Sequence, residues 1–270
     1  MARELTGKRA ILTGASSGIG KALAAELAAA GVKLALASRT AESLESLAAD
    51  LRAKGATAVV VPCDVTVPAD RERLIATAVQ ELGGLDLLVN AAGVAGFGHF
   101  ATATDDLNRR VMEVNFFGPV ELTRLAVPHL MKGSQPAVVN VASMCGRRGM
   151  PAWPEYSASK FALVAMGEAW RAEFVRFGVD AVTILPGLTK SEFARHLLRN
   201  DGKMDIPFGK GMEPAYVAKR IVAAVRANRK EVVLGSEAKW MLRFNRFAPR
   251  LLNTLIARKV RKLYASESAK

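Results

Sequence analysis

Short apolar runs alternate along the chain with longer stretches of helical periodicity. Seven of these runs are rich in Val, Leu and Ala and have the length of buried strands. They are RAILT at 9–13, KLALAS at 33–38, TAVVVP at 57–62, LDLLVN at 85–90, AVVNVA at 137–142, DAVTIL at 180–185 and EVVLG at 231–235. Strands that alternate with helices form parallel sheets covered on both faces. The pattern therefore predicts an α/β fold with a single doubly wound parallel sheet.

Residues that end or begin helices lie between these runs. Gly31, Gly55 and Gly83 follow helical stretches, at places where a left-handed cap residue is expected. Pro68 suits the first turn of a helix. No internal repeat and no Gly/Ser/Pro linker divides the chain, so we expect residues 1–235 to form one domain.

Residues 188–214 interrupt this alternation. They are long, mixed in character and contain several Gly and Pro residues, as expected of an excursion between the sixth and seventh strands. In an open α/β sheet, an insertion at the carboxyl end of a strand usually borders the ligand crevice. We therefore expect this excursion to shape the substrate site.

Composition narrows the class of protein. The chain has 270 residues, of which 50% are apolar, and this is enough for a large core. Its first ten residues contain no apolar run, and nowhere does it reach the roughly 18 uncharged apolar residues of a membrane span. Its two cysteines and three histidines lack ligand spacing, which argues against a metal site or a disulfide framework. We expect a cytoplasmic protein without a transmembrane helix.

A glycine-rich turn, TGASSGIG at 13–20, directly follows the first strand run and precedes a helical stretch. Glycine lets the backbone approach a pyrophosphate closely, and the helix N-terminus offers free N–H groups and a positive dipole end. An ordinary tight turn is the alternative, but the position between strand and helix favours nucleotide binding. The expected contact residues are Gly14, Ser16, Ser17, Gly18, Ile19 and Gly20.

The end of the second strand run indicates which nucleotide binds. An acidic residue there would accept from a ribose 2′-hydroxyl, but this chain has Ser38, Arg39 and Thr40. A guanidinium and two hydroxyls suit a 2′-phosphate. We therefore favour NADP(H) over NAD(H), the alternative being that Arg39 is an ordinary solvated charge.

The segment YSASK places Tyr156 and Lys160 four residues apart, on one face of a helix. This spacing also occurs by chance on solvated helices, so it decides nothing alone. Other motifs accompany it in a fixed order: TGASSGIG at 13–20, CDV at 63–65, NAAG at 90–93, VNFFG at 114–118, VNVAS at 139–143, YSASK at 156–160 and PGLTKSEF at 186–193. Together they resemble the short-chain dehydrogenases/reductases over about residues 5–235.

This resemblance implies a Rossmann-type fold and assigns roles to individual residues. The catalytic tetrad would be Asn115, Ser143, Tyr156 and Lys160. Besides the glycine turn and residues 38–40, the cofactor would contact Asp64, Val65, Asn90, Ala91, Gly93, Tyr156, Lys160, Pro186, Gly187, Thr189 and Ser191. Asp64 would accept from the adenine amino group, and Asn90 would brace the cofactor loop. Ser191 stands where many members carry Thr, and it keeps the hydroxyl.

The implied chemistry is hydride transfer to or from a carbonyl carbon. Tyr156 would donate the proton, and Lys160 together with the positive nicotinamide would lower its pKa from about 10. Ser143 would donate to the developing oxyanion, and Asn115 would hold a water that links Lys160 to solvent. Homodimers or homotetramers are common in the family.

The expected substrate is a fairly apolar carbonyl or alcohol, such as an acyl chain or a sterol-like molecule. Apolar side chains are expected beside the crevice, although the same residues could belong to the core. They are Phe97, Phe100, Met144, Met150, Trp153, Phe193 and Leu197. Two alternatives stay open: a 3-oxoacyl-thioester reductase, and a non-catalytic NADPH-responsive binding protein.

The last segment, 236–270, lies beyond the expected sheet. The formal net charge of the chain is +13, and this segment alone holds nine Lys and Arg residues against two Glu. Its apolar residues follow helical steps, with basic residues one position before them. The two sets are Trp240, Phe244, Phe247, Leu251 and Leu255, and Lys239, Arg243, Arg246 and Arg250.

Pro249 is expected to divide this segment into two helices. An apolar face flanked by cations suits an anionic membrane surface, and packing on the domain itself or across an oligomer is the alternative. Nucleic acid is not an expected partner, because the segment lacks a base-stacking pattern.

Overall fold

The computed structural model describes residues 2–190, 197–204 and 208–265. Seven parallel strands form one sheet in the order β3-β2-β1-β4-β6-β7-β9. Their bounds are β1 Arg9–Thr13, β2 Lys33–Ser38, β3 Ala58–Pro62, β4 Leu87–Asn90, β6 Ala137–Val141, β7 Asp180–Pro186 and β9 Glu231–Leu234. All seven predicted runs are strands of this sheet, so the predicted fold class is confirmed.

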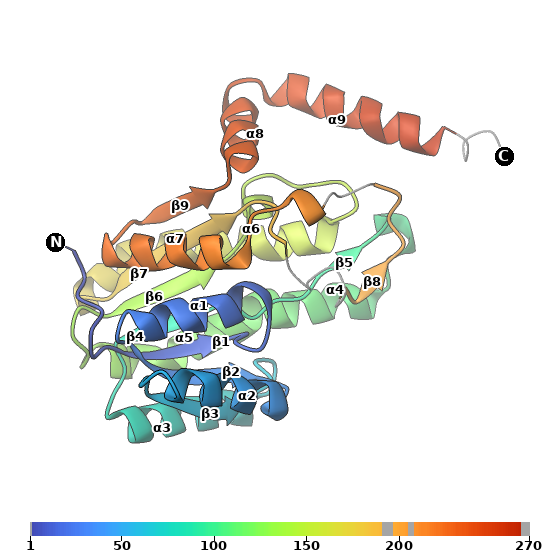
Figure 1. Ribbon diagram of the computed structural model, residues 1–270. Helices are drawn as coiled ribbons and strands as arrows, with labels where there is room; N and C mark the ends of the chain where they lie inside the picture. Colours follow the sequence, from blue (N-terminus) through green and yellow to red (C-terminus); the bar gives the residue numbers. More distant parts are fainter. Residues whose placement is uncertain (1, 191–196, 205–207, 266–270) are drawn as a thin grey trace.

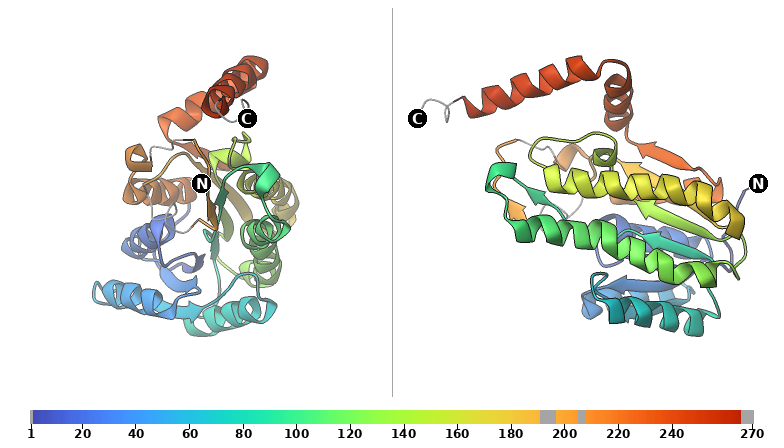
Figure 2. Two further views of the ribbon diagram at one scale, coloured as in Figure 1. Left: turned by 90° about the vertical axis from the view of Figure 1, so that its right-hand side faces the viewer. Right: turned by 180° about the vertical axis from the view of Figure 1, so that it is seen from behind.

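Helices cover both faces of the sheet (Figures 1 and 2). They are α1 Gly18–Ala29, α2 Ala41–Arg52, α3 Pro68–Leu82, α4 Asp105–Met112, α5 Gly118–Leu130, α6 Pro154–Glu173, α7 Pro214–Arg226, α8 Ser236–Phe247 and α9 Pro249–Tyr264. One apolar core holds buried residues of α1, α2 and α7, and a second core holds those of α3, α5 and α6. The two cores lie on opposite faces of the sheet.

The strands feed both cores because side chains alternate across a sheet. In β1, Leu12 belongs to the core of α1 and α7, whereas Ile11 belongs to the core of α3 and α5. In β2, Leu36 and Ala35 divide in the same way. A strand buried on both sides needs apolar residues at every position, and this explains the continuous runs in the sequence.

The predicted helix ends are confirmed. Gly31, Gly55 and Gly83 have φ angles of +80°, +83° and +77°, which glycine adopts without strain. Pro68 is the first residue of α3, and Pro249 begins α9 directly after α8 has ended. The chain therefore turns where its sequence indicates.

The sheet order reverses beside β1, which pairs with both β2 and β4. The chain goes from β1 to β2 on one side of this point and from β4 to β6 on the other, and in open α/β sheets the carboxyl ends of two such strands are where a ligand binds. The excursion of residues 188–214 follows β7, and the backbone N–H of Met212 donates to Leu188 O at 2.9 Å at its base. The sequence did not predict the pairing of β5 Gly96–Phe97 with β8 Arg199–Asn200, because two-residue strands carry no periodicity.

The two last helices form an arm that leaves the end of β9 (Figures 1 and 2). Arg148 donates to Asn245 Oδ1 of α8 at 2.9 Å and to Asn253 Oδ1 of α9 at 2.6 Å. At the far end of α9, the ring of Tyr264 lies 4.3 Å from that of His99. The arm is thus held at both helices by the body of the molecule. None of the helices within the described ranges is long and apolar enough to cross a membrane.

Candidate active site

The glycine turn is packed so closely that side chains would not fit. Gly14 has a φ of +69°, and a Cβ there would lie 2.8 Å from Ala92 Cα. A Cβ on Gly20 would lie 1.9 Å from Gly14 O. Ser17 precedes α1 without capping it through its side chain, and the first turn of α1 holds no acidic residue. The turn and the positive end of α1 therefore fit a pyrophosphate.

Thr13, at the end of β1, holds the neighbouring loop. The backbone N–H groups of Ala91 and Ala92 donate to Thr13 Oγ1 at 3.1 and 3.2 Å. The amide of Asn90, which is expected to brace the cofactor loop, donates to Asn140 Oδ1 at 2.9 Å and to Thr123 Oγ1 at 3.3 Å. Thr13 is the first residue of the glycine motif, but the motif alone does not indicate this role. A hydroxyl at a strand end directly before a glycine turn was the available signal.

The end of β2 has the features expected of a ribose site. Ser38 Oγ is buried and has no hydrogen-bond partner among the described residues. Arg39 and Thr40 follow it and are exposed. A buried hydroxyl without a partner is costly in a closed protein, so this position fits a polar ligand.

Asp64 follows β3, the strand that pairs with β2. Its Oδ1 accepts from the backbone N–H and the hydroxyl of Thr66 at 2.9 and 2.7 Å, and its Oδ2 accepts from Arg110 Nη2 at 3.1 Å. Burial acts to raise the pKa of Asp64, but these bonds outweigh it and the pKa lies below its ordinary value. Val65 beside it packs on Gly118, where a Cβ would lie 2.9 Å from Val65 Cγ2. Asp64 is therefore ionised and already bonded within the chain.

Asn115 lies in a π-helical turn, Glu113–Phe117, that joins α4 to α5. The Asn115 amide donates to Val94 O at 2.8 Å and to Ser159 Oγ at 2.9 Å, and its Oδ1 accepts from the N–H of Val94 at 2.8 Å. π turns inside helices are frequent at functional sites, because they shift a side chain away from the regular helix face. Asn115 thus ties the loop after β4 to Ser159 of α6, a partner that the sequence did not indicate.

Ser143, Tyr156 and Lys160 come together at the end of β6. Ser143 follows this strand, and Tyr156 and Lys160 lie on the first turns of α6. Ser143 is hydrogen-bonded to Tyr156. The Lys160 ammonium lies 5.7 Å from the centre of the Tyr156 ring and donates to Val141 O at 3.2 Å. A Cβ built on Gly93 would lie 3.5 Å from Lys160 Nζ and 3.3 Å from Asn115 Oδ1, so the backbone of Gly93 lies beside both tetrad members.

Burial controls the protonation of this pair. It raises the pKa of Tyr156 well above its ordinary value, and the hydrogen bond with Ser143 opposes the rise only in part. It also lowers the pKa of Lys160 to about 8. The lowering of the Tyr156 pKa that the sequence analysis expected does not occur with the protein side chains alone, because desolvation outweighs them. That expectation also invoked the positive nicotinamide.

An apolar wall stands next to Tyr156. Phe97, Trp153, Met150 and Leu197 pack together with it in one cluster. The Trp153 ring lies 5.0 Å from the Phe97 ring and 5.8 Å from the Tyr156 ring. Four of the apolar residues expected near the crevice therefore lie beside the tyrosine.

The remaining residues expected near the crevice differ in their exposure, and two of them lie outside the described residues. Phe100 is exposed, and Ser191 and Phe193 lie outside the described residues. Thr189 is buried and its hydroxyl donates to Gly187 O at 3.1 Å. Gly187 follows Pro186 at the end of β7, and a Cβ on it would lie 2.9 Å from Ala238 Cβ of α8. The arm therefore packs against the segment expected to face the nicotinamide.

Comparisons with known proteins show the family of the chain. The family model for short chain dehydrogenases matches residues 8–202. The bovine protein named dehydrogenase/reductase SDR family member 7B is 35% identical over 93% of this chain and 81% of its own length. An uncharacterized oxidoreductase of Bacillus subtilis, YxnA, is 34% identical over 91% of this chain and 70% of its own length.

Solved structures give the same result. A short-chain dehydrogenase/reductase from Burkholderia phymatum in complex with NAD has a TM-score of 0.84 at 25% identity, over 92% of this chain and 96% of its own. A short chain dehydrogenase from Burkholderia cenocepacia in complex with NADP has a TM-score of 0.77 at 26% identity, over 88% of this chain and 100% of its own. With its parallel sheet and its family match, the chain belongs to the short-chain dehydrogenase/reductase family.

Proposed function

We propose that the chain is an NADPH-dependent oxidoreductase that transfers a hydride between the nicotinamide and the carbonyl or secondary alcohol of a fairly apolar substrate. The observation that carries this proposal is the group at the end of β6: Tyr156 is bonded to Ser143, with the Lys160 ammonium 5.7 Å from its ring. A buried phenol with two polar neighbours suits proton transfer to an oxygen that gains charge.

The chain's own residues would act in a definite order during reduction. The nicotinamide, when bound, supplies the hydride. Tyr156 is the catalytic acid and gives its proton to the substrate oxygen, because burial keeps the phenol protonated until that oxygen becomes basic. Ser143 donates a hydrogen bond to the same oxygen. Lys160 stabilises the phenolate that remains, and it binds the cofactor beside Gly93.

Asn115 serves as a positioning residue in this scheme. Both of its amide hydrogens are used by Val94 and Ser159, so a water that it holds would bond to its Oδ1. Through that water, protons from solvent would reach Lys160 and then Tyr156. Asn115 also fixes the loop that carries Gly93, which lies beside the Lys160 ammonium.

The preference for NADPH rests on the end of β2. Arg39 is exposed there beside the buried hydroxyl of Ser38, and none of residues 38–40 is acidic. Solved relatives hold NAD in one case and NADP in another, so the family alone leaves both cofactors open. Replacing Arg39 by Asp would remove the proposed phosphate partner. We expect the ratio of NADPH to NADH affinity to fall at least about tenfold, because charge-assisted bonds to phosphate are strong.

The apolar cluster around Tyr156 supports an acyl- or sterol-like substrate. A 3-oxoacyl-thioester reductase is the nearest rival, since the net charge of +13 would attract an acidic carrier protein. The rates on a carrier-bound 3-oxoacyl chain and on a free ketone of equal chain length separate the two. A binding protein without turnover is the remaining alternative, and the complete tetrad argues against it.

The test is NADPH oxidation with a panel of ketones and aldehydes of increasing apolar size. We expect turnover that increases with the apolar area of the substrate and that is faster with NADPH than with NADH. Tight NADPH binding without turnover on any substrate of the panel would contradict the activity and favour the binding protein.

We also propose that residues 236–270 are an extension that docks on an anionic membrane, next to a catalytic domain of residues 1–235. Five large apolar side chains support this docking, because all of them are exposed on the arm. We call them the outer stripe; they are Trp240, Phe244, Phe247, Leu251 and Leu255. We propose a homodimer or homotetramer because such assemblies are common in the family. It would bury the outer stripe only if the arms of two subunits contact each other.

A further inference from the structure

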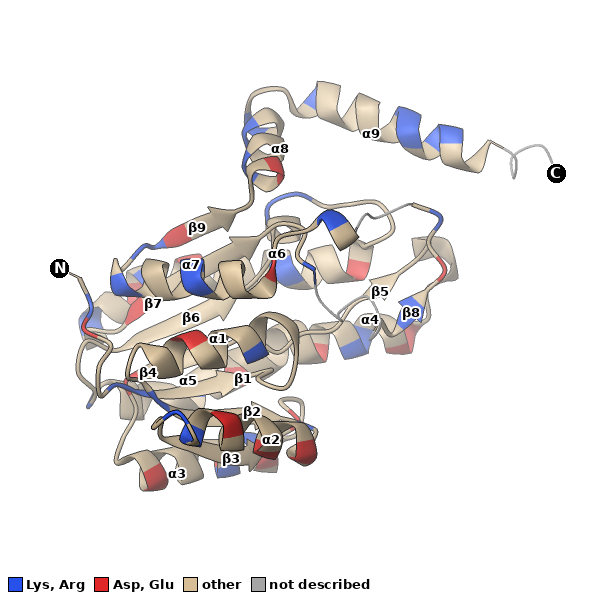
Figure 3. Ribbon diagram, viewed as in Figure 1, with Lys and Arg blue, Asp and Glu red and all other residues tan. Residues whose placement is uncertain are grey.

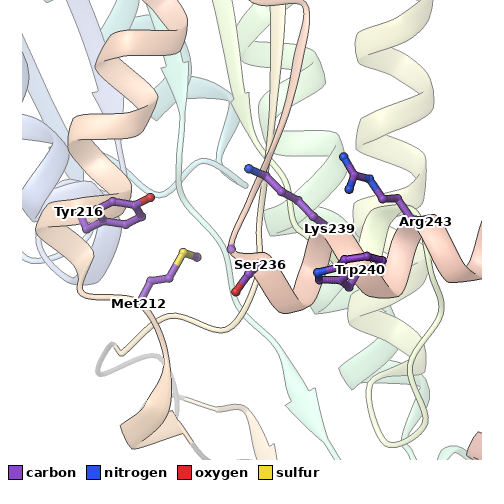
Figure 4. A pocket seen from close by; sticks show the side chains of 7 residues that line it. Met212, Tyr216, Ser236, Lys239, Trp240 and Arg243 are labelled. Atoms are coloured by element: carbon purple, nitrogen blue, oxygen red, sulfur yellow. The ribbon is translucent and has the colours of Figure 1, made fainter.

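Two hollows that share two lining residues lie near α7, β9 and α8. The larger, of about 1030 Å³, is bounded by all three elements, and the smaller, of about 390 Å³, lies at the start of α8. Lys239 and Arg243 line both hollows. In Figure 4, Tyr216 of α7 and Lys239 of α8 point into the same space, and Trp240 also lines the smaller hollow. Because the two hollows share Lys239 and Arg243, we treat them together as one trough beside α8. The proposed chemistry uses neither of them.

Besides Arg147, five cations line this trough, which we call the basic groove. They are Arg220, Arg229, Lys239, Arg243 and Arg246. None of the five forms an ion pair with an acidic residue in the part of the chain that the structure describes. The acid that does line the groove, Glu231, is bonded to Arg147 at 2.5 Å. Figure 3 shows Lys and Arg positions on α7 and α8, the two helices whose residues line the groove.

The floor of the groove is apolar and comes from Ala224, Val232, Val233 and Leu242. A ligand that suits this surface carries negative charge and stands on an apolar body. Guanidinium groups from α7, from the turn before β9 and from α8 can surround a phosphate from several sides. A phosphate-bearing amphiphile matches both parts of the groove.

The groove and the outer stripe belong to adjacent faces of α8. Lys239, Arg243 and Arg246 each stand one residue before a stripe residue, which is about 100° around a helix. The Arg243 guanidinium also lies 5.8 Å from the ring of Trp240. A flat surface that receives Trp240 and Phe244 would therefore bring its charged layer to the groove.

A second copy of the chain suits the groove poorly. A two-fold interface places the same patch on both partners, so five cations would face five cations. Like charges that are brought together in this way oppose association. This charge argument favours an anionic ligand over self-association at the groove.

We propose that the basic groove binds the phosphate of an anionic phospholipid headgroup while the outer stripe enters the acyl region of the same leaflet. This inference rests on the proposed membrane docking and adds to it a binding site with named residues. It makes docking depend on particular cations and not on the net charge of the chain alone.

The test compares three double variants with the wild-type chain. Arg220→Glu with Arg229→Glu reverses the groove charge and leaves the outer stripe intact. Lys54→Glu with Lys132→Glu is the matched control, because both lysines are exposed, lie outside the groove and change the net charge equally. Trp240→Ser with Phe247→Ser removes the stripe and keeps every cation.

Binding is measured by sedimentation with vesicles of phosphatidylcholine alone and of phosphatidylcholine with phosphatidic acid. We expect the wild type to bind only the vesicles that contain phosphatidic acid. Groove reversal should weaken that binding at least about tenfold, and the matched control should stay within about twofold of the wild type. An equal loss in groove and control variants would overturn the site and leave only diffuse attraction.

Four further outcomes would contradict the assignment of the groove to a membrane phospholipid. Binding by the groove variant equal to the wild type, while the stripe variant is lost, overturns the groove and keeps the docking. Glycerol 3-phosphate that binds the groove while vesicles do not would assign it to a free phosphate and overturn the lipid. Duplex DNA bound as tightly as the vesicles would also overturn the lipid assignment. A change of oligomeric state in the groove-reversal variant would overturn it as well. NADPH turnover on a soluble ketone is recorded in each variant, so loss of the enzymatic proposal is seen separately.

Discussion

In the catalytic crevice, polar side chains are buried and bonded to the chain, whereas in the arm large apolar side chains face solvent. Lys160 is only 4% exposed, while Trp240 and Phe247 are 68% and 81% exposed. Folding has buried the polar groups that would do chemistry. It has left large apolar side chains, which are ordinarily buried, in contact with water. The buried tetrad residues therefore find partners within the chain, whereas the side chains of the outer stripe stay in contact with water.

The largest effect of a substitution on stability is expected in the crevice, at Gly20 of the glycine turn. Gly20→Ala places a Cβ 1.9 Å from Gly14 O, and a helix backbone cannot yield there without moving the turn. We expect the free energy of unfolding to fall by more than about 3 kcal/mol, with loss of NADPH binding. Gly149→Ala is the control, since its Cβ meets nothing within 4 Å. Equal stability of the two variants in urea would show that the turn is not constrained.

A smaller effect of opposite sign is expected at Lys160. Burial lowers its pKa from the ordinary 10.5 to about 8, so below pH 8 the folded chain holds a buried charge at a cost. Lys160→Met should stabilise the fold by up to about 3 kcal/mol at pH 7 and remove turnover. The gain should shrink as pH rises from 8 toward 10.5, where the unfolded chain also loses this proton. Thermal unfolding across that pH range measures it, and a variant less stable than the wild type at pH 7 would contradict the cost of burial.

The smallest effect on stability should be found in the arm. Trp240→Ser with Phe247→Ser removes two exposed rings, so unfolding free energy should change by no more than about 0.5 kcal/mol per site. Solution turnover should stay within about twofold, because neither ring contacts the tetrad. A large loss of stability in dilute protein would mean that the stripe is packed in an oligomer, and the contrast between the regions would then disappear.

The sequence was most informative where one physical requirement fixes the residue type. Strands buried on both faces need continuous apolar residues, and the runs at 9–13 and 33–38 match β1 and β2 at both ends. Gly14 and Gly20 were readable because any side chain there would meet backbone. The tetrad positions converge on the end of β6 and its neighbours, as the motif order indicated.

Features that depend on tertiary contacts were not readable. The pairing of β5 with β8 joins residues about a hundred positions apart and has no local pattern. Thr13 and Ser159 act through partners on other elements, so spacing could not reveal them. The direction of the Tyr156 pKa depended on burial, which a motif does not report. The periodicity of the arm predicts its apolar and basic stripes. Only the structure shows that Ala238 and Leu252 face inward and are buried, whereas the outer stripe is exposed.

The central claim is that Tyr156 delivers the proton, and Tyr156→Phe tests it most directly. This change removes one hydroxyl and keeps the ring against Trp153, so fold and cofactor binding should persist. The measurement is NADPH consumption with a ketone that the wild type reduces, with NADPH binding followed by cofactor fluorescence in the same sample. We predict a rate at least about a hundredfold lower with unchanged NADPH affinity. A rate within a few-fold of the wild type, with NADPH bound, would contradict the account.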